Sequence, residues 1–159
     1  MKRGSNVRGI LVSACLLGEE CRYDGKSARN QELVALLEEY MEQIRIVAVC
    51  PEEMGGIRTP RDPAELQNGR VVTKTGEDVT AAYLRGATKT LKTAQKFGCT
   101  LAVLKDRSPS CGKSSVYDGT FSGVLQPGSG VCAALLAQHG IRVLSEHELS
   151  ELKAFLEQE

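Results

Sequence analysis

The residues GILVSACLLG, at positions 9–18, begin with a short apolar run and then reach a cysteine. The run from Gly9 to Ala14 has the length and the apolar content of a buried strand. Three further short runs, rich in β-branched side chains, have the same character: Ile44–Val49, Leu101–Leu104 and Ile141–Leu144. The four runs together predict four strands of one sheet.

Segments with the period of an amphipathic helix alternate with these predicted strands. Apolar side chains recur at helical spacing over residues 33–41, 79–94, 131–138 and 149–156. Alternation of this kind implies right-handed crossovers and a mostly parallel sheet with helices on both faces. The sequence therefore predicts a three-layer, Rossmann-like α/β fold, and the chain length fits one domain over residues 1–159.

Two long stretches lack this periodicity. Residues 55–77 contain Gly-Gly, two prolines and the turn signal Asn68-Gly69, so they predict a long loop with a small hairpin around Val71–Lys74. Residues 105–128 form a second irregular stretch. Loops of this length in compact domains usually serve a functional site or are disordered.

The composition argues against two classes of partner. Twenty basic and twenty acidic residues cancel at pH 7, and no run of Lys or Arg suits a phosphate backbone, so nucleic acid is not expected as a partner. The apolar stretch Gly9–Ala14 is too short for a signal-peptide core or a membrane helix. We therefore expect a soluble, cytoplasmic protein without a membrane partner, and the sequence does not predict its oligomeric state.

The chain has six cysteines, and in a reducing compartment cysteines are more often metal-binding or catalytic than disulfide-bonded. Cys15 and Cys50 directly follow predicted strands, and Cys111 lies in the loop that leaves the third. Because carboxyl ends of parallel strands share one edge, these three are expected to converge there. Cys99, before a strand, and Cys132, on the apolar side of a helix, are predicted to be core residues.

Three thiols at one edge indicate a metal centre, although cysteines that only pack in a core would give the same pattern. Structural zinc sites use four ligands, often in C-x-x-C pairs, and this chain has no such pair. A 4Fe-4S cluster accepts scattered ligands, and three thiolates would leave one iron open as a Lewis acid. The alternative functions are a non-catalytic iron-sulfur or zinc-binding redox sensor, and a sulfur-transfer enzyme with Cys15 or Cys111 as nucleophile.

Four motifs resemble those of a known family: SACLLG (13–18), CRYDG (21–25), CPEEMGG (50–56) and SPSCG (108–112). Over nearly its whole length the chain resembles the short, stand-alone form of the thiouracil desulfidase family. The resemblance implies an oxygen-sensitive 4Fe-4S cluster, held by Cys15, Cys50 and Cys111 with one open iron. It also implies the non-redox desulfuration of a small thiolated substrate such as 2-thiouracil, which gives uracil and sulfide.

Turning a C=S bond into C=O needs a base for water and a proton source beside the Lewis acid. Glu52, two residues after Cys50, is the predicted acid-base residue, and capping of a helix start is its alternative role. Asp24 is a candidate to bind a substrate N–H or to stabilise its own turn. Ser108 and Ser110 are candidates to hydrogen-bond substrate or cluster sulfur, or to cap the Ser-Pro turn.

Three residues remain outside this assignment. Cys21 is not counted as a ligand; it either relays protons, holds sulfide transiently or packs as a small apolar side chain. His139 and His147 stand near predicted helix ends without a partner spacing, so they are predicted to be surface or capping residues.

Overall fold

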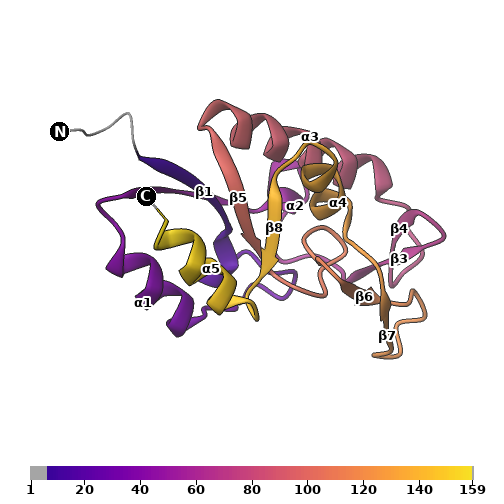
Figure 1. Ribbon diagram of the computed structural model, residues 1–159. Coiled ribbons are helices and arrows are strands. Elements are labelled where there is room, and N and C mark those ends of the chain that lie inside the picture. Colours follow the sequence, from indigo (N-terminus) through magenta and orange to yellow (C-terminus); the bar gives the residue numbers. More distant parts are fainter. Residues whose placement is uncertain (1–6, 159) are drawn as a thin grey trace.

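The computed structural model describes residues 7–158 and contains a four-stranded parallel sheet. Its strands are β1 (Arg8–Ser13), β2 (Ile44–Val49), β5 (Cys99–Leu104) and β8 (Arg142–Ser145). They lie in the order β2-β1-β5-β8 (Figure 1). All four strands predicted from the apolar runs are present.

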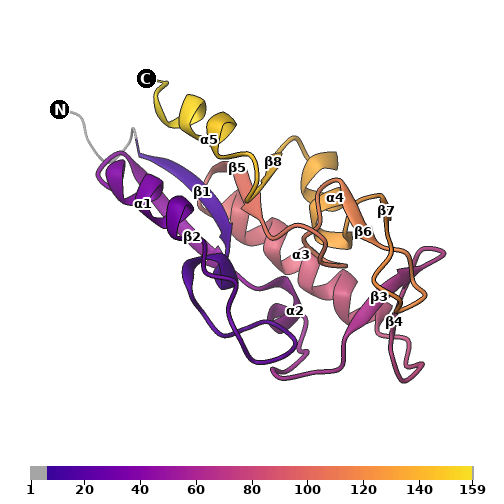
Figure 2. The same ribbon diagram turned by 90° about the horizontal axis from the view of Figure 1, so that it is seen from below.

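Helices cover both faces of the sheet, as Figures 1 and 2 show. The two pairs are α1 (Gln31–Glu39) with α5 (Leu149–Leu156), and α3 (Thr80–Lys96) with α4 (Val131–Gln138). Successive side chains of a strand point to opposite faces, and β1 follows this rule. Ile10 and Val12 join the core with α1 and α5, and Leu11 joins the core with α3 and α4. The predicted three-layer α/β fold is confirmed.

The chain order reverses next to β1. From β1 the chain passes to β2 at one edge, and then returns past β1 to β5. In open α/β sheets such a reversal leaves a crevice at the carboxyl ends of the strands, where ligands bind. Two short helices follow the strands here: the 3-10 helix η2 (Ala14–Leu17) after β1 and α2 (Pro51–Met54) after β2.

The short helix α2 was not predicted, and its close contact with α3 explains its position. A Cβ atom at Gly86 of α3 would lie 1.9 Å from the Pro51 carbonyl oxygen, and one at Gly55 would lie 2.1 Å from that of Ala82. Only glycines permit this approach of two backbones. The contact fixes α2, and with it the residues after Cys50, against the long helix α3.

Two small hairpins lie to one side of the main sheet (Figure 2). The predicted one comprises β3 (Ala64–Gln67) and β4 (Arg70–Thr73). Asn68 and Gly69 both have positive φ, as its two-residue turn requires. The other, β6 (Ser115–Tyr117) with β7 (Leu125–Pro127), was not predicted. Its strands are three residues long and all three residues of β7 are exposed, so no alternation of polar and apolar residues marks it.

No helix among residues 7–158 combines the length and apolar character needed to cross a membrane.

Candidate active site at the carboxyl edge of the sheet

The three predicted ligand cysteines line one cavity of about 560 Å³. Cys15 lies in η2, Cys50 immediately precedes α2, and Cys111 lies in the loop after β5. Each therefore follows a different strand of the parallel sheet, and the strand order brings the three loops to one edge.

Hydrogen bonds to the main chain hold Cys15 and Cys111 in place. The Cys15 carbonyl oxygen accepts from the Ala28 N–H at 3.0 Å, so the approach to α1 supports η2. The Ser108 Oγ accepts from the N–H groups of Ser110 and Cys111, both at 3.0 Å. The Ser110 carbonyl oxygen in turn accepts from the Cys132 N–H at 2.8 Å, at the start of α4. The SPSCG loop is thus closed on itself and tied to α4.

Burial and neighbouring thiols raise the pKa values of Cys21, Cys50 and Cys111. The Cys50 thiol donates to the Cys21 carbonyl oxygen at 3.8 Å. Contact with the Cys15 thiol, together with burial, raises the pKa of Cys21 to about 12, although contact with the Cys50 thiol acts the other way. Contact with Cys21 and burial raise the pKa of Cys50, and burial raises that of Cys111.

This donor set fits an iron-sulfur cluster better than a single ion. Thiolates are the ligands of such clusters, and each iron needs only one of them. Among residues 7–158, no three His, Cys, Asp or Glu side chains are grouped closely enough to hold one metal ion. Within the same residues, the buried Ser110 hydroxyl beside Cys111 in the chain has no hydrogen-bond partner, but Ser110 does not line the cavity.

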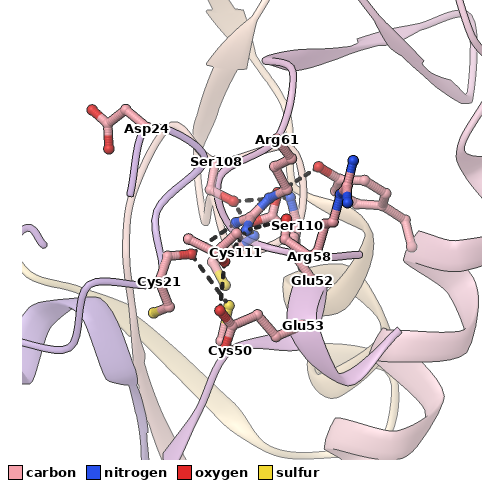
Figure 3. Close-up of polar contacts among 12 residues, drawn as sticks. Cys21, Asp24, Cys50, Glu52, Glu53, Arg58, Arg61, Ser108, Ser110 and Cys111 are labelled. Atoms are coloured by element: carbon pink, nitrogen blue, oxygen red, sulfur yellow. Dashed lines mark hydrogen bonds and ion pairs between the residues drawn. The ribbon is translucent and has the colours of Figure 1, made fainter. Parts of the chain in front are cut away.

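Glu52 lines the cavity and accepts hydrogen bonds on both carboxylate oxygens (Figure 3). Arg61 Nη2 donates to Oε1 at 2.7 Å, and the Tyr83 hydroxyl donates to Oε2. Burial and the neighbouring Glu52 raise the pKa of Tyr83, so its hydroxyl remains a donor. Glu53 does not line this cavity, and its carboxylate accepts from the Thr59 hydroxyl. The structure therefore places Glu52, and not Glu53, at the cavity.

Of the other candidate residues, Ser108 lines the cavity and Asp24 does not. The Asp24 carboxylate accepts from the Lys26 N–H at 3.0 Å and pairs with Arg22 at 3.3 Å. Asp24 does not line the cavity, and in Figure 3 its carboxylate points away from the cysteines. Its contacts are those of a residue that stabilises its own turn. Ser108 lines the cavity while it caps the SPSCG loop.

Sequence reasoning missed Arg61 and Tyr83 as site residues. Arg61 donates to Glu52 and also to the Cys21 carbonyl oxygen at 2.9 Å, and its side chain is 6% exposed. Tyr83 belongs to the apolar face of α3, so the sequence pattern predicts only a core residue at this position. A signal was available, because a buried tyrosine hydroxyl needs a hydrogen-bond partner.

The cysteines and histidines predicted to lie outside the site do so. Cys99 and Cys132 pack in the core with α3 and α4, and neither lines the cavity. Burial raises the pKa of Cys132 to about 12. His139 and His147 are exposed, at the end of α4 and shortly before α5.

Comparison with known proteins identifies the family of the chain. A family model described as 2-thiouracil desulfurase matches residues 10–148. The uncharacterized protein YbbK of Bacillus subtilis (strain 168) is 46% identical over 153 residues, which cover 90% of this chain and 99% of YbbK. A solved structure described as the [4Fe-4S]-dependent thiouracil desulfidase TudS is 48% identical and superposes with a TM-score of 0.85, covering 94% of this chain and 97% of that chain. The chain therefore belongs to the 2-thiouracil desulfurase family.

Proposed function

We propose that this protein is an iron-sulfur desulfidase, which converts a small thiolated substrate such as 2-thiouracil into uracil and sulfide. The observation that carries the proposal is the cavity in which three cysteines from three strand ends meet the carboxylate of Glu52. The similarity to a solved [4Fe-4S]-dependent thiouracil desulfidase supports it. Cys15, Cys50 and Cys111 would hold a 4Fe-4S cluster, which supplies an open iron as Lewis acid toward the substrate sulfur.

The overall reaction is a hydrolysis and needs no electrons. The oxygen of one water replaces the sulfur on the substrate carbon, and the two protons of that water leave with the sulfide. The chain must therefore supply a group that takes a proton from water and returns it. Glu52 is the acidic residue of the cavity nearest in sequence to a proposed ligand, Cys50.

The contacts of Glu52 favour a role as base. Arg61 places a positive charge beside the carboxylate, and the Tyr83 hydroxyl donates to it, so Glu52 acts as an acceptor in the structure. Both partners come from other segments and fix the orientation of the carboxylate. A fixed orientation lowers the cost of bringing base and water together.

The SPSCG loop supplies further hydrogen bonds. The Ser108 Oγ already accepts two N–H groups, so its own O–H is left to donate to substrate or to cluster sulfur. The buried hydroxyl of Ser110 lacks a partner among the described residues, but Ser110 does not line the cavity, so the proposal assigns the hydrogen bond to Ser108 alone. Asp24 stabilises the turn that follows Cys21, and the proposal gives it no contact with substrate.

Two measurements on the same preparation test the proposal. Protein purified without oxygen is expected to contain about four irons per chain and to release sulfide from 2-thiouracil, with uracil formed in equal amount. Protein from which iron has been chelated is the control. Sulfide release that persists without iron would favour an enzyme with a cysteine nucleophile, and full iron content without sulfide release would favour a sensor.

A further inference from the structure

A fourth thiol, Cys21, lines the cavity beside the three proposed ligands. Its side chain contacts the thiols of Cys15 and Cys50. Its carbonyl oxygen accepts from the Cys50 thiol at 3.8 Å, as Figure 3 shows. The proposed desulfuration uses Cys21 neither as ligand nor as base. Its contacts with Cys15 and Cys50 therefore need a separate explanation.

The surrounding structure holds Cys21 in this position. Arg61 donates to its carbonyl oxygen at 2.9 Å, and Glu52 anchors the same guanidinium group. The following turn is closed by a bond from the Arg22 N–H to the Lys26 carbonyl oxygen at 3.1 Å. The contact between Cys21 and Cys50 therefore belongs to a fixed part of the site.

We propose that Cys21 is the resolving thiol of the cluster-free protein, and that it forms a reversible disulfide with Cys50. Cys50 is the partner rather than Cys15, because Cys50 is partly exposed while Cys15 is buried, and because the Cys50 sulfur already lies 3.8 Å from the Cys21 carbonyl oxygen. A disulfide requires two sulfurs that can approach to about 2 Å without backbone movement. Cys99 and Cys132 lie in the core and do not line the cavity.

Glutathione disulfide is a sufficient oxidant, and the step balances as a thiol-disulfide exchange. The Cys50 thiol loses its proton to solvent and then attacks one sulfur of glutathione disulfide, which releases one glutathione. The Cys21 thiolate then attacks the Cys50 sulfur and releases the second glutathione. Two protein thiols are oxidised to one disulfide, and one glutathione disulfide is reduced to two thiols.

The consequence for the cluster rests on the proposed function. A Cys50 bonded to Cys21 is not free to bind iron, so the oxidised site would take up no cluster until it is reduced. The bond would also keep Cys50 from oxidation beyond the reversible states of a thiol.

The test uses the full chain, freed of iron and incubated overnight under argon with a glutathione redox buffer. Wild-type protein is expected to lose two of its six thiols and to yield a cross-linked peptide that joins Cys21 to Cys50. The Cys21→Ser variant is expected to keep glutathione on Cys50 and to form no bridge. The Cys99→Ser variant, with its change in the core, is the matched control and should form the bridge as wild type does.

Three results would overturn the proposal: wild-type protein that keeps six thiols, a bridge between Cys15 and Cys50, or a bridge between Cys15 and Cys21. A second arm uses iron-loaded protein, which should form no bridge until a chelator is added. A bridge that forms while iron is retained would overturn the link to the cluster. Wild-type protein that binds no iron would contradict the proposed function, and the iron-free arm would still test the disulfide.

Discussion

The floor and the outer wall of the cavity are stabilised in different ways. The floor consists of the strand ends with Cys15, Cys50 and Cys111, and it rests on fully buried residues of the main sheet such as Leu11 and Val12. The wall includes residues of the two hairpins and of the loop between β6 and β7. Burial of apolar surface holds the floor, whereas a few hydrogen bonds hold the wall.

The Glu65 carboxylate and the Gln67 amide join the first hairpin to the loop between β6 and β7. The Glu65 Oε1 accepts from the N–H groups of Gly119 and Phe121, at 3.0 and 3.1 Å. Phe121 has a φ of 57°, which is unfavourable for an aromatic residue and persists only when neighbouring contacts enforce it. We therefore expect changes in the floor to alter cluster binding and chemistry, and changes in the wall to alter substrate binding.

The largest expected effect lies in the floor, at Cys111. Cys111→Ser should lose the cluster, because the hydroxyl replaces one of three thiolate ligands, and sulfide release should fall to background. Iron content and sulfide release are measured on protein purified without oxygen. Cys132→Ala is the matched control; it removes a core thiol, so it should keep its iron at a modest cost in stability. Equal iron loss in both variants would show that the choice of cysteines is wrong.

A smaller loss of activity is expected from a change at Glu52. Glu52 lines the cavity beside the floor but is not proposed to bind iron. Glu52→Gln keeps the size and an acceptor oxygen but removes the base, so turnover of 2-thiouracil should fall by roughly a hundredfold to ten-thousandfold. Its iron content should equal that of wild type. Glu53→Gln, one residue further and outside the cavity, should stay within a few-fold of wild type. Similar rates for both variants would remove Glu52 from the mechanism.

Tyr83 tests whether the orientation of Glu52 matters. Tyr83→Phe removes the hydroxyl that donates to Glu52 and keeps the buried ring, so kcat should fall by about fivefold, the rate equivalent of one hydrogen bond of ~1 kcal/mol. KM should change little, because the wall is untouched. Steady-state kinetics at several substrate concentrations separate the two constants. A rise in KM alone would place Tyr83 in substrate binding.

The smallest effect is expected in the wall, at Glu65. Glu65→Ala leaves two N–H groups without their acceptor, so KM should rise by a few-fold to about tenfold while kcat and iron content stay near wild type, in line with a loss of ~1 kcal/mol. Glu65→Gln still offers an acceptor oxygen and should restore most of the affinity. Loss of iron from Glu65→Ala would contradict the division between floor and wall.

Local sequence patterns determined the elements of this fold and the cysteines of its site. Four apolar runs marked the strands, helical periodicity marked the four longer helices, and Asn68-Gly69 marked the first hairpin. These signals are readable because side-chain spacing follows local backbone geometry. The position of Cys15 and Cys50 after two such runs placed both at the edge of a parallel sheet before the strand order was known.

Tertiary structure alone decided the strand order β2-β1-β5-β8, the second hairpin and the partners of Glu52. Tyr83 lies 31 positions from Glu52 in the sequence and reads as one more residue of an apolar helix face. Its contact with Glu52 exists because Gly55 and Gly86 let α2 and α3 approach closely. Such contacts depend on how distant segments pack, so the local spacing of side chains in the sequence does not predict them.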